Sequence, residues 1–195
     1  MRKWGWRLPF ALAACGLIAS APVAGTGKKE KVREEVAIID TNLGRITFRF
    51  FHQESPKAIE AFKQLARSGF YNGIQFHKVM PGLLIQAGDP RTRDTTAPQV
   101  EAAPLDIEKS ALKHHPGTVS MVHDPNDPRS RSEFFICLQE VSYFDGRHTI
   151  IGEVISNLKV VGAISNVPRD MKQAPLFPVR IRRLTVEVQE YFREK

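Results

Sequence analysis

The sequence predicts a mainly β protein in which two α-helices cap a closed or nearly closed antiparallel barrel. Short apolar runs follow one another with Pro, Gly, Asn or Asp between them, as is typical of consecutive antiparallel strands. Only two segments carry apolar residues at helical spacing, and they interrupt the strands instead of alternating with them. The 195 residues, 42% of them hydrophobic and 25% charged, suffice for one globular domain and a leader.

The first predicted elements are a hairpin and a helix. Apolar runs at residues 36–40 and 46–51 flank a turn at residues 42–44, which predicts two paired strands. A helix then begins at residues 55–56, a serine followed by a proline, because a hydroxyl can cap the first turn and proline fits the first helical position. Apolar residues recur at helical spacing until Gly69 ends the helix.

The remaining chain contains further strands and one more helix, and it shows no internal repeat. The predicted strands are residues 74–80, 83–87, 117–123, 133–138, 149–154 and 179–189, and the second helix is residues 158–165.

The first 25 residues have the composition of an export leader. Arg2, Lys3 and Arg7 give a positive start, and the run from Leu8 to Ala24 carries no charge. This run is interrupted by proline and glycine and is marginal in length for a membrane-spanning helix. We therefore expect an exported protein.

Two ways of processing this leader stay open. Leu12-Ala13-Ala14-Cys15 is similar to a bacterial lipobox, in which the cysteine is lipidated and becomes the mature N-terminus. The alternative is cleavage near Ala24 or Gly25. If Cys15 is lipidated, we expect a lipoprotein anchored to the membrane through its N-terminus. If the leader is cleaved near Ala24 or Gly25, we expect a periplasmic protein.

Beyond the leader, the sequence predicts a linker and one domain. Residues 26–35 are rich in Lys and Glu and predict a solvated linker, so we expect the domain to span residues 36–195. Only one cysteine, Cys137, lies in this domain, which excludes an intrachain disulfide there.

The charge distribution and the spacing of potential metal ligands argue against nucleic-acid binding and against metal binding. The net charge of +7 is partly due to the leader, and the other basic residues are spread among acids, so we expect no nucleic-acid partner. His114 and His115 are adjacent and therefore face different ways, and no Cys or carboxylate spacing predicts a metal site.

Three motifs in sequence order carry a family resemblance. They are the segment from Phe76 to Asp89 with its central Pro-Gly, the segment Ser132-Glu133-Phe134-Phe135-Ile136-Cys137, and Phe144-Asp145-Gly146-Arg147-His148. Over about residues 35–190 the chain resembles the cyclophilin family of peptidyl-prolyl isomerases. The resemblance implies a closed eight-stranded antiparallel β-barrel with a helix at each end, and catalysed isomerisation of X-Pro bonds.

Rotation about an X-Pro bond needs neither a nucleophile nor a cofactor. The twisting amide loses its resonance, and the uncatalysed exchange takes tens of seconds or longer. An apolar pocket for the proline ring helps, as does a cation aimed at the prolyl nitrogen, which regains its lone pair in the transition state. We accordingly expect no cofactor, proline-containing polypeptides as partners, and a monomer.

The resemblance also assigns site residues. Lys78 stands at the position of the catalytic cation. Phe76 would pack beneath the pocket, Gln86 would steady the cation, and the residue before proline would contact Val122 and His123. The substrate-binding residues that the resemblance implies are Phe76, Leu83, Leu84, Gln86, Val122, His123, Glu133, Phe135, Tyr143, Phe144 and His148.

The chain departs from the family pattern at this site. Lys78 replaces arginine, Glu133 replaces glutamine, Leu83-Leu84 replace the common Phe-Met pair, and Tyr143 stands where many members have Trp or Phe. We expect the Glu133 carboxylate to pair with the Lys78 ammonium and to draw it from the prolyl nitrogen, which would lower the activity.

These departures leave three function classes open. The first is a working prolyl isomerase that assists the folding of exported proteins. The second is a cyclophilin-fold module that binds proline-containing segments or a partner with little or no turnover. The third, a purely structural envelope protein, has no sequence feature in its favour beyond the lipobox-like segment. A prolyl-peptide isomerase assay discriminates between the first two.

Overall fold

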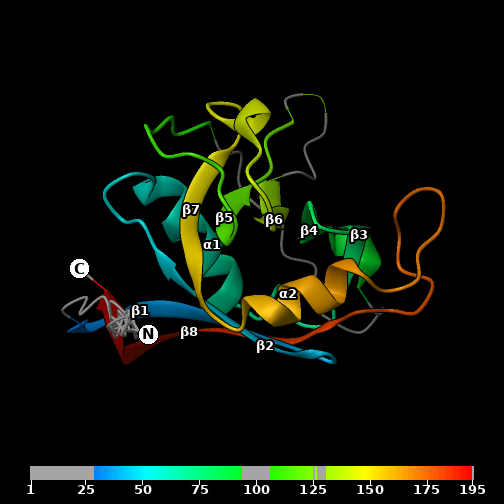
Figure 1. Cartoon of the computed structure of the whole chain (residues 1–195), viewed down its shortest axis with the longest axis horizontal. Coiled ribbons are helices and arrows are strands. Elements are labelled where there is room, and N and C mark those ends of the chain that lie inside the picture. Colours follow the sequence, from blue (N-terminus) through cyan, green and yellow to red (C-terminus); the bar gives the residue numbers. More distant parts are fainter. Residues whose placement is uncertain (1–28, 94–105, 125, 127–130, 195) are drawn as a thin grey trace, which may run out of the picture.

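The computed structural model describes residues 29–93, 106–124, 126 and 131–194, which form an eight-stranded antiparallel sheet packed against two α-helices (Figure 1). The strand order across the sheet is β3-β4-β6-β5-β7-β2-β1-β8. The elements are β1 (Lys29–Thr41), β2 (Gly44–Phe50), α1 (Pro56–Arg67), β3 (Phe76–Met80), β4 (Leu84–Ala87), the 3-10 helix η1 (Pro90–Thr92), β5 (Thr118–Met121), β6 (Phe134–Cys137), the 3-10 helix η3 (Ser142–Phe144), β7 (Thr149–Ser156), α2 (Leu158–Ser165) and β8 (Ile181–Glu194).

All strands and both helices predicted from the sequence are present. The first helix begins at Pro56 as expected, but the Ser55 hydroxyl does not cap it, because it donates to the carbonyl of Ile150 at 2.7 Å. The amides of Lys57 and Ala58 instead donate to the carboxylate of Glu108, at 3.2 and 2.7 Å. A side chain far away in the sequence therefore satisfies the first turn of α1.

Aromatic side chains form the centre of the main hydrophobic core. The ring of Phe62 on α1 lies 5.6 Å from Phe48, 5.0 Å from Tyr71 and 5.6 Å from Phe134, measured between centroids. Helix α1 contacts β7 and β8, and α2 contacts β2, β3 and β4 (Figure 1). The core thus fixes the inner face of the sheet and leaves its outer face for other contacts.

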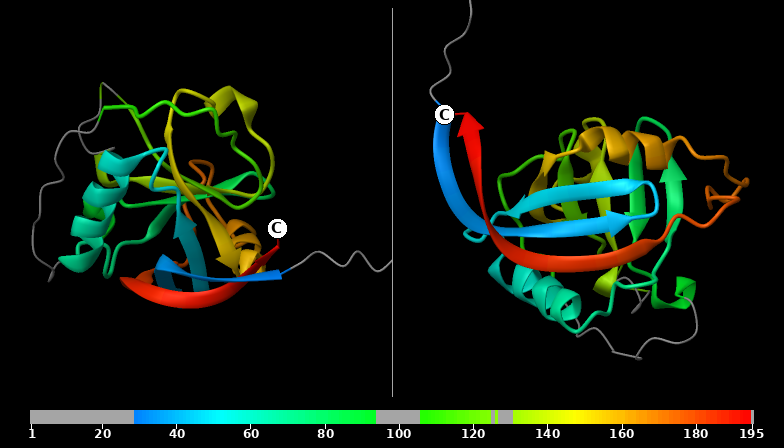
Figure 2. Two further views of the ribbon diagram at one scale, coloured as in Figure 1. Left: turned by 90° about the vertical axis from the view of Figure 1, so that its left-hand side faces the viewer. Right: turned by 90° about the horizontal axis from the view of Figure 1, so that it is seen from below.

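Residues 29–35, expected as part of a linker, form the first half of β1 instead. They pair with β8 from Lys29 opposite Glu194 onward, and Figure 2 shows the two strands curving together past the rest of the sheet. Lys31 pairs with Glu190 at 2.6 Å, and the Tyr191 hydroxyl donates to Glu34. The linker expectation was wrong here because cross-strand partners complement the charges that suggested a solvated segment.

The two edge strands of the sheet, β3 and β8, approach each other just before each strand begins. Gln75 and Arg180 form an isolated antiparallel bridge. The amide of Phe76 donates to the Val179 carbonyl, and the amide of Ile181 donates to the Ile74 carbonyl, both at 2.8 Å. Among the described residues, no helix is both long enough and apolar enough to cross a membrane.

Candidate active site

A pocket of about 500 Å³ lies on the outer face of the sheet, over β3, β4 and β6. Ten residues assigned to the site from the sequence line it, namely Lys78, Leu83, Leu84, Gln86, Val122, His123, Glu133, Phe135, Phe144 and His148. Met80 and Asp124 also line the pocket, although neither was expected to.

Strand register brings the central residues of this pocket into one row. Lys78 on β3 lies opposite Gln86 on β4, which lies opposite Phe135 on β6, and Phe135 lies opposite Ser120 on β5. Directly opposed residues share a face of the sheet, with Cβ atoms about 5 Å apart. The row therefore places a cation, an amide and an aromatic ring side by side.

A bulge in β3 helps to place the cation. The register slips between Phe76 and Lys78, so that His77 is the extra residue of this strand. Phe76 is buried in the main core, whereas Lys78 is exposed and lines the pocket. Because strict alternation would turn residues 76 and 78 to the same face, the bulge accounts for the outward direction of Lys78.

Phe135 forms the base of the pocket and is 2% exposed. It belongs to a small apolar cluster with Leu84 and Cys137, separate from the main core. Its ring meets those of Phe144 and His148 edge-on, at centroid distances of 5.3 and 5.2 Å. An apolar surface of this kind suits a proline ring.

His114 supports this base from below and ties the far side of the pocket to the sheet. Its fully buried ring stacks on Phe135 at 5.7 Å, and its Nδ1 lies 2.9 Å from Asp145 Oδ1. Because a carboxylate can only accept, Nδ1 carries the proton, and Nε2 is left to accept from the Ser120 hydroxyl at 3.2 Å. Burial lowers the pKa of His114, against the opposing effect of Asp145.

These three side chains have the order Ser-His-Asp of a hydrolase triad but cannot act as one. Ser120 and His114 both have no exposed surface, so no substrate carbonyl can reach the hydroxyl. Their arrangement is structural: the amide of His114 also donates to Asp145, at 3.0 Å, and the amide of Val141 donates to the His114 carbonyl. The network therefore positions the segment that contains Phe144.

His148 completes the pocket as a neutral side chain. Its Nδ1 accepts from the backbone amide of His123 at 3.1 Å, so the ring proton is on Nε2. Burial, with smaller effects of His114, His123 and Arg147, lowers the pKa of His148 to about 4.

The depressed pKa of His148 predicts a pH dependence of stability. The unfolded histidine, with a pKa of about 6.5, binds a proton more readily than the folded one, so acidification favours unfolding in this range. The stability that neutral His148 contributes is therefore present above about pH 6.5 and is lost as the pH falls toward about 4. We expect His148→Asn, which keeps an acceptor near the position of Nδ1 but does not titrate, to show a smaller drop in Tm between about pH 7.5 and about pH 4.5 than the wild type. Equal drops would contradict this assignment.

Glu133 does not pair with Lys78, contrary to expectation. The residue is 8% exposed, its carboxylate accepts from Gln86 Nε2 at 2.6 Å, and the same oxygen lies 3.5 Å from His77 Nε2. The Lys78 ammonium makes no hydrogen bond or ion pair with any residue that the structure describes. The expected contact between Gln86 and Lys78 is likewise absent among the described residues, and the amide nitrogen of Gln86 donates to Glu133.

Two expected site residues lie outside the pocket. Phe76 is 1% exposed and belongs to the main core on the opposite face of the sheet, which agrees with packing beneath the site but excludes contact with a ligand. Tyr143 is 68% exposed and packs against Arg147, whose guanidinium carbon lies 4.2 Å from the ring centroid. Tyr143 is therefore not among the described residues that line the pocket, whereas Phe144 and His148 are.

The two residues that sequence reasoning missed had signals in the chain. Met80 lies two positions after Lys78 on the same strand, so simple alternation would have placed it on the same face. Asp124 follows His123, which was assigned, but an aspartate directly before a proline is more typical of a turn. Cys15 lies outside the described residues, and in the part of the chain that the structure describes no three His, Cys, Asp or Glu side chains form a metal-binding group.

Fold and pocket together define a protein of eight antiparallel strands with an apolar pocket beside a cation, and comparison with known proteins identifies the family. The model of the family "Cyclophilin type peptidyl-prolyl cis-trans isomerase/CLD" matches residues 36–186. A peptidyl-prolyl cis-trans isomerase of Helicobacter pylori is 35% identical over 129 residues, which cover 66% of this chain and 78% of that protein. One of Schizosaccharomyces pombe is 33% identical over 145 residues, covering 73% and 93%.

A solved structure agrees with these relatives. The cyclophilin-type isomerase of Cryptosporidium parvum, crystallised in the presence of the dipeptide Ala-Pro, superposes with a TM-score of 0.69 at 28% identity. The match covers 78% of this chain and 98% of that one. The chain belongs to the cyclophilin-type peptidyl-prolyl cis-trans isomerase family. Its function is the cis-trans isomerisation of X-Pro peptide bonds.

Proposed function

We propose that the pocket binds the proline of an X-Pro segment against Phe135 and that Lys78 donates to the prolyl nitrogen in the transition state. Twisting the amide restores a lone pair on this nitrogen, and a donor placed there stabilises the twisted state more than either planar isomer. Phe135, Phe144 and Leu84 provide the apolar surface that accommodates the ring.

The single observation that supports this role is the state of Lys78. It is the only lysine or arginine among the described residues that line the pocket. Its ammonium is exposed and has no hydrogen-bond partner within the described ranges, so its donors are available to a ligand.

Titration of ¹⁵N-labelled protein with an Ala-Pro peptide tests the binding part of this proposal. We expect shift changes centred on Phe135, Leu84 and His148, and none of comparable size with an Ala-Ala peptide of equal length. Shift changes confined to another face, or equal effects of both peptides, would contradict the assignment of the pocket.

A second candidate, a proline-binding module with weak or no turnover, is favoured by the same lysine. Lysine is a flexible point charge, whereas the arginine usual at this position has a planar fork that can bind two groups at once. Because Gln86 does not bind Lys78, the ammonium is less fixed than the resemblance implied. If the protein is a proline-binding module with weak turnover, Lys78→Arg raises kcat/KM in an isomerase assay. If Lys78 is an effective donor, Lys78→Arg does not raise kcat/KM.

Export is proposed from the leader and is compatible with the domain. The positive start and the uncharged run of residues 8–24 indicate export, to the periplasm or as a membrane-anchored lipoprotein, where the enzyme would assist the folding of exported proteins. The one cysteine of the domain, Cys137, is fully buried. Burial, and to a smaller extent Asp145, raise its pKa to about 12, so it would be unreactive in an oxidising compartment.

Replacement of Cys15 distinguishes the two ways of processing. If the cysteine is lipidated, the wild type is found with the membrane fraction, and Cys15→Ala is released or left unprocessed. One acyl chain gives only marginal membrane affinity, so the several chains of a bacterial lipoprotein are needed for this result. A mature N-terminus at or near Thr26, determined by mass spectrometry, would exclude the lipoprotein and leave export intact.

Closure of the sheet into a barrel and the monomeric state are two further proposals. The bridge and hydrogen bonds between the segments before β3 and β8 support closure of the sheet into a barrel. The domain has its own core within the described residues, which supports a monomer; a mass of two chains in light scattering would contradict this.

A further inference from the structure

Glu133 carries a nearly buried carboxylate, although X-Pro isomerisation at this site depends on a cation that donates to the prolyl nitrogen. The only hydrogen bond that its side chain makes among the described residues comes from Gln86 Nε2, at 2.6 Å, and His77 Nε2 lies 3.5 Å from the same oxygen. Neither a lysine nor an arginine of the described ranges pairs with it. Burying a charge with so few partners costs stability, so a role beyond packing would account for it.

The backbone holds Glu133 in a fixed place. Its carbonyl accepts from the amide of Val122 at 2.9 Å. Gly88 packs directly against it, because a Cβ at residue 88 would lie 2.7 Å from Glu133 Cα and 2.3 Å from the Ser132 carbonyl oxygen. With the main chain fixed in this way, the carboxylate can bind Gln86 with little loss of conformational freedom.

A carboxylate at this position determines which way the Gln86 amide faces. A carboxylate only accepts hydrogen bonds, so Gln86 can meet it only with its NH2 group. The carbonyl oxygen of the amide is then left as an acceptor. Lys78 lies directly opposite Gln86 in the strand register and on the same face of the sheet.

We propose that Glu133 is a positioning residue, which holds the Gln86 amide with its NH2 group toward β6 and its carbonyl oxygen available to the ammonium of Lys78. The side chains of Gln86 and Lys78 share no hydrogen bond in the structure, so the amide acts through its dipole, whose negative end then faces the cation. With a neutral glutamine at position 133 both amide orientations are possible, and one of them would turn NH2 protons toward the ammonium and repel it. Glu133 thus compensates through Gln86 for the missing guanidinium fork, a role that rests on Lys78 acting as the donor in isomerisation.

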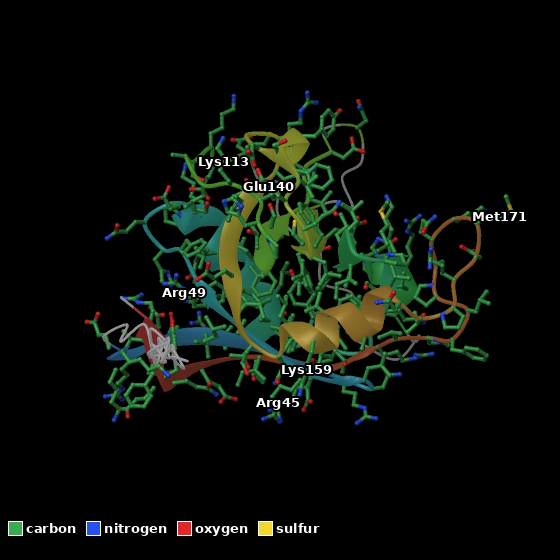
Figure 3. The ribbon with its side chains drawn as sticks, viewed as in Figure 1. Arg45, Arg49, Lys113, Glu140, Lys159 and Met171 are labelled. Atoms are coloured by element: carbon green, nitrogen blue, oxygen red, sulfur yellow. The ribbon has the colours of Figure 1, made fainter. Side chains whose placement is uncertain are left out.

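Kinetics of four variants test this role. Glu133→Gln keeps the shape of the side chain and is expected to lower kcat/KM about fivefold, mainly through kcat, because an ill-positioned donor affects the transition state more than binding. In the Gln86→Ala background the same change is expected to have no further effect. Glu140→Gln serves as the control, because it removes the same charge from an exposed residue near η3 (Figure 3). Its kcat/KM should match that of the wild type. An undiminished effect of Glu133→Gln without Gln86 would overturn the proposal.

A spectroscopic readout separates this proposal from isomerase activity itself. The short, charge-assisted bond predicts that one side-chain NH2 proton of Gln86 is shifted strongly downfield in ¹H–¹⁵N spectra, and that Glu133→Gln abolishes this shift. Rescue of the kinetics by Glu133→Asp together with a partial return of the shift would support the role. An unshifted Gln86 amide in the wild type would overturn it, even if the enzyme is active.

Discussion

Lys78→Ala is expected to lower kcat/KM for an X-Pro peptide by about a hundredfold, because loss of one transition-state donor typically costs on the order of 3 kcal/mol. The described structure offers no second lysine or arginine in the pocket that could replace it. A protease-coupled prolyl-peptide assay measures the change.

We expect Lys78→Ala to leave the stability of the fold unchanged. Lys78 is exposed, and its side chain makes no hydrogen bond or ion pair within the described residues, so the Tm of Lys78→Ala is expected to match that of the wild type. Lys159→Ala on α2 (Figure 3) removes an exposed lysine remote from the pocket and should leave both rate and Tm unchanged. An unchanged rate in Lys78→Ala would mean that this cation does not take part in isomerisation.

Gly152→Ala is expected to destabilise the protein by about 3 kcal/mol or more, because the added methyl group has no room. A Cβ at residue 152 would lie 1.9 Å from the backbone oxygen of Arg49 and 3.2 Å from the ring of Phe48. Gly152 lies on β7, opposite Phe50 of β2 and Val119 of β5, so the strands on both sides would have to move.

Urea or thermal unfolding measures this effect, and another glycine provides the control. A Cβ at Gly162 on α2 would meet no atom within 4 Å, and alanine is a better helix former by about 1 kcal/mol. Gly162→Ala should therefore leave stability unchanged or raise it. Equal stability of Gly152→Ala and the wild type would show that β2 and β7 are not packed as closely as described.

The local sequence predicted the elements well, because apolar periodicity and turn residues reflect the core directly. The second helix, for instance, spans Leu158–Ser165 as its apolar spacing indicated. The ribbon of β1 and β8 could not be predicted in this way. Residues 29–35 look like a solvated linker until their partners on β8, more than a hundred residues later, are known.

The site was predicted as a set of residues but not as a set of contacts. The motif order brought Lys78, Gln86 and Glu133 together correctly. The partner of Glu133 depends on the bulge at His77 and on the close approach of Gly88, which are features of the tertiary structure. Tyr143 faces solvent because the short helix η3 presents Phe144 to the pocket instead, and one residue of shift in such a turn decides which side chain lines the site.

The most direct test of the central claim is exchange NMR on an X-Pro peptide with a substoichiometric amount of the wild-type protein. Turnover by a lysine-bearing pocket predicts cis-trans exchange cross-peaks at mixing times at which the free peptide shows none, since uncatalysed exchange takes tens of seconds or longer. The cross-peaks should be lost with Lys78→Ala. Peptide shifts that report binding without any exchange cross-peaks would contradict the account and identify the protein as a proline-binding module.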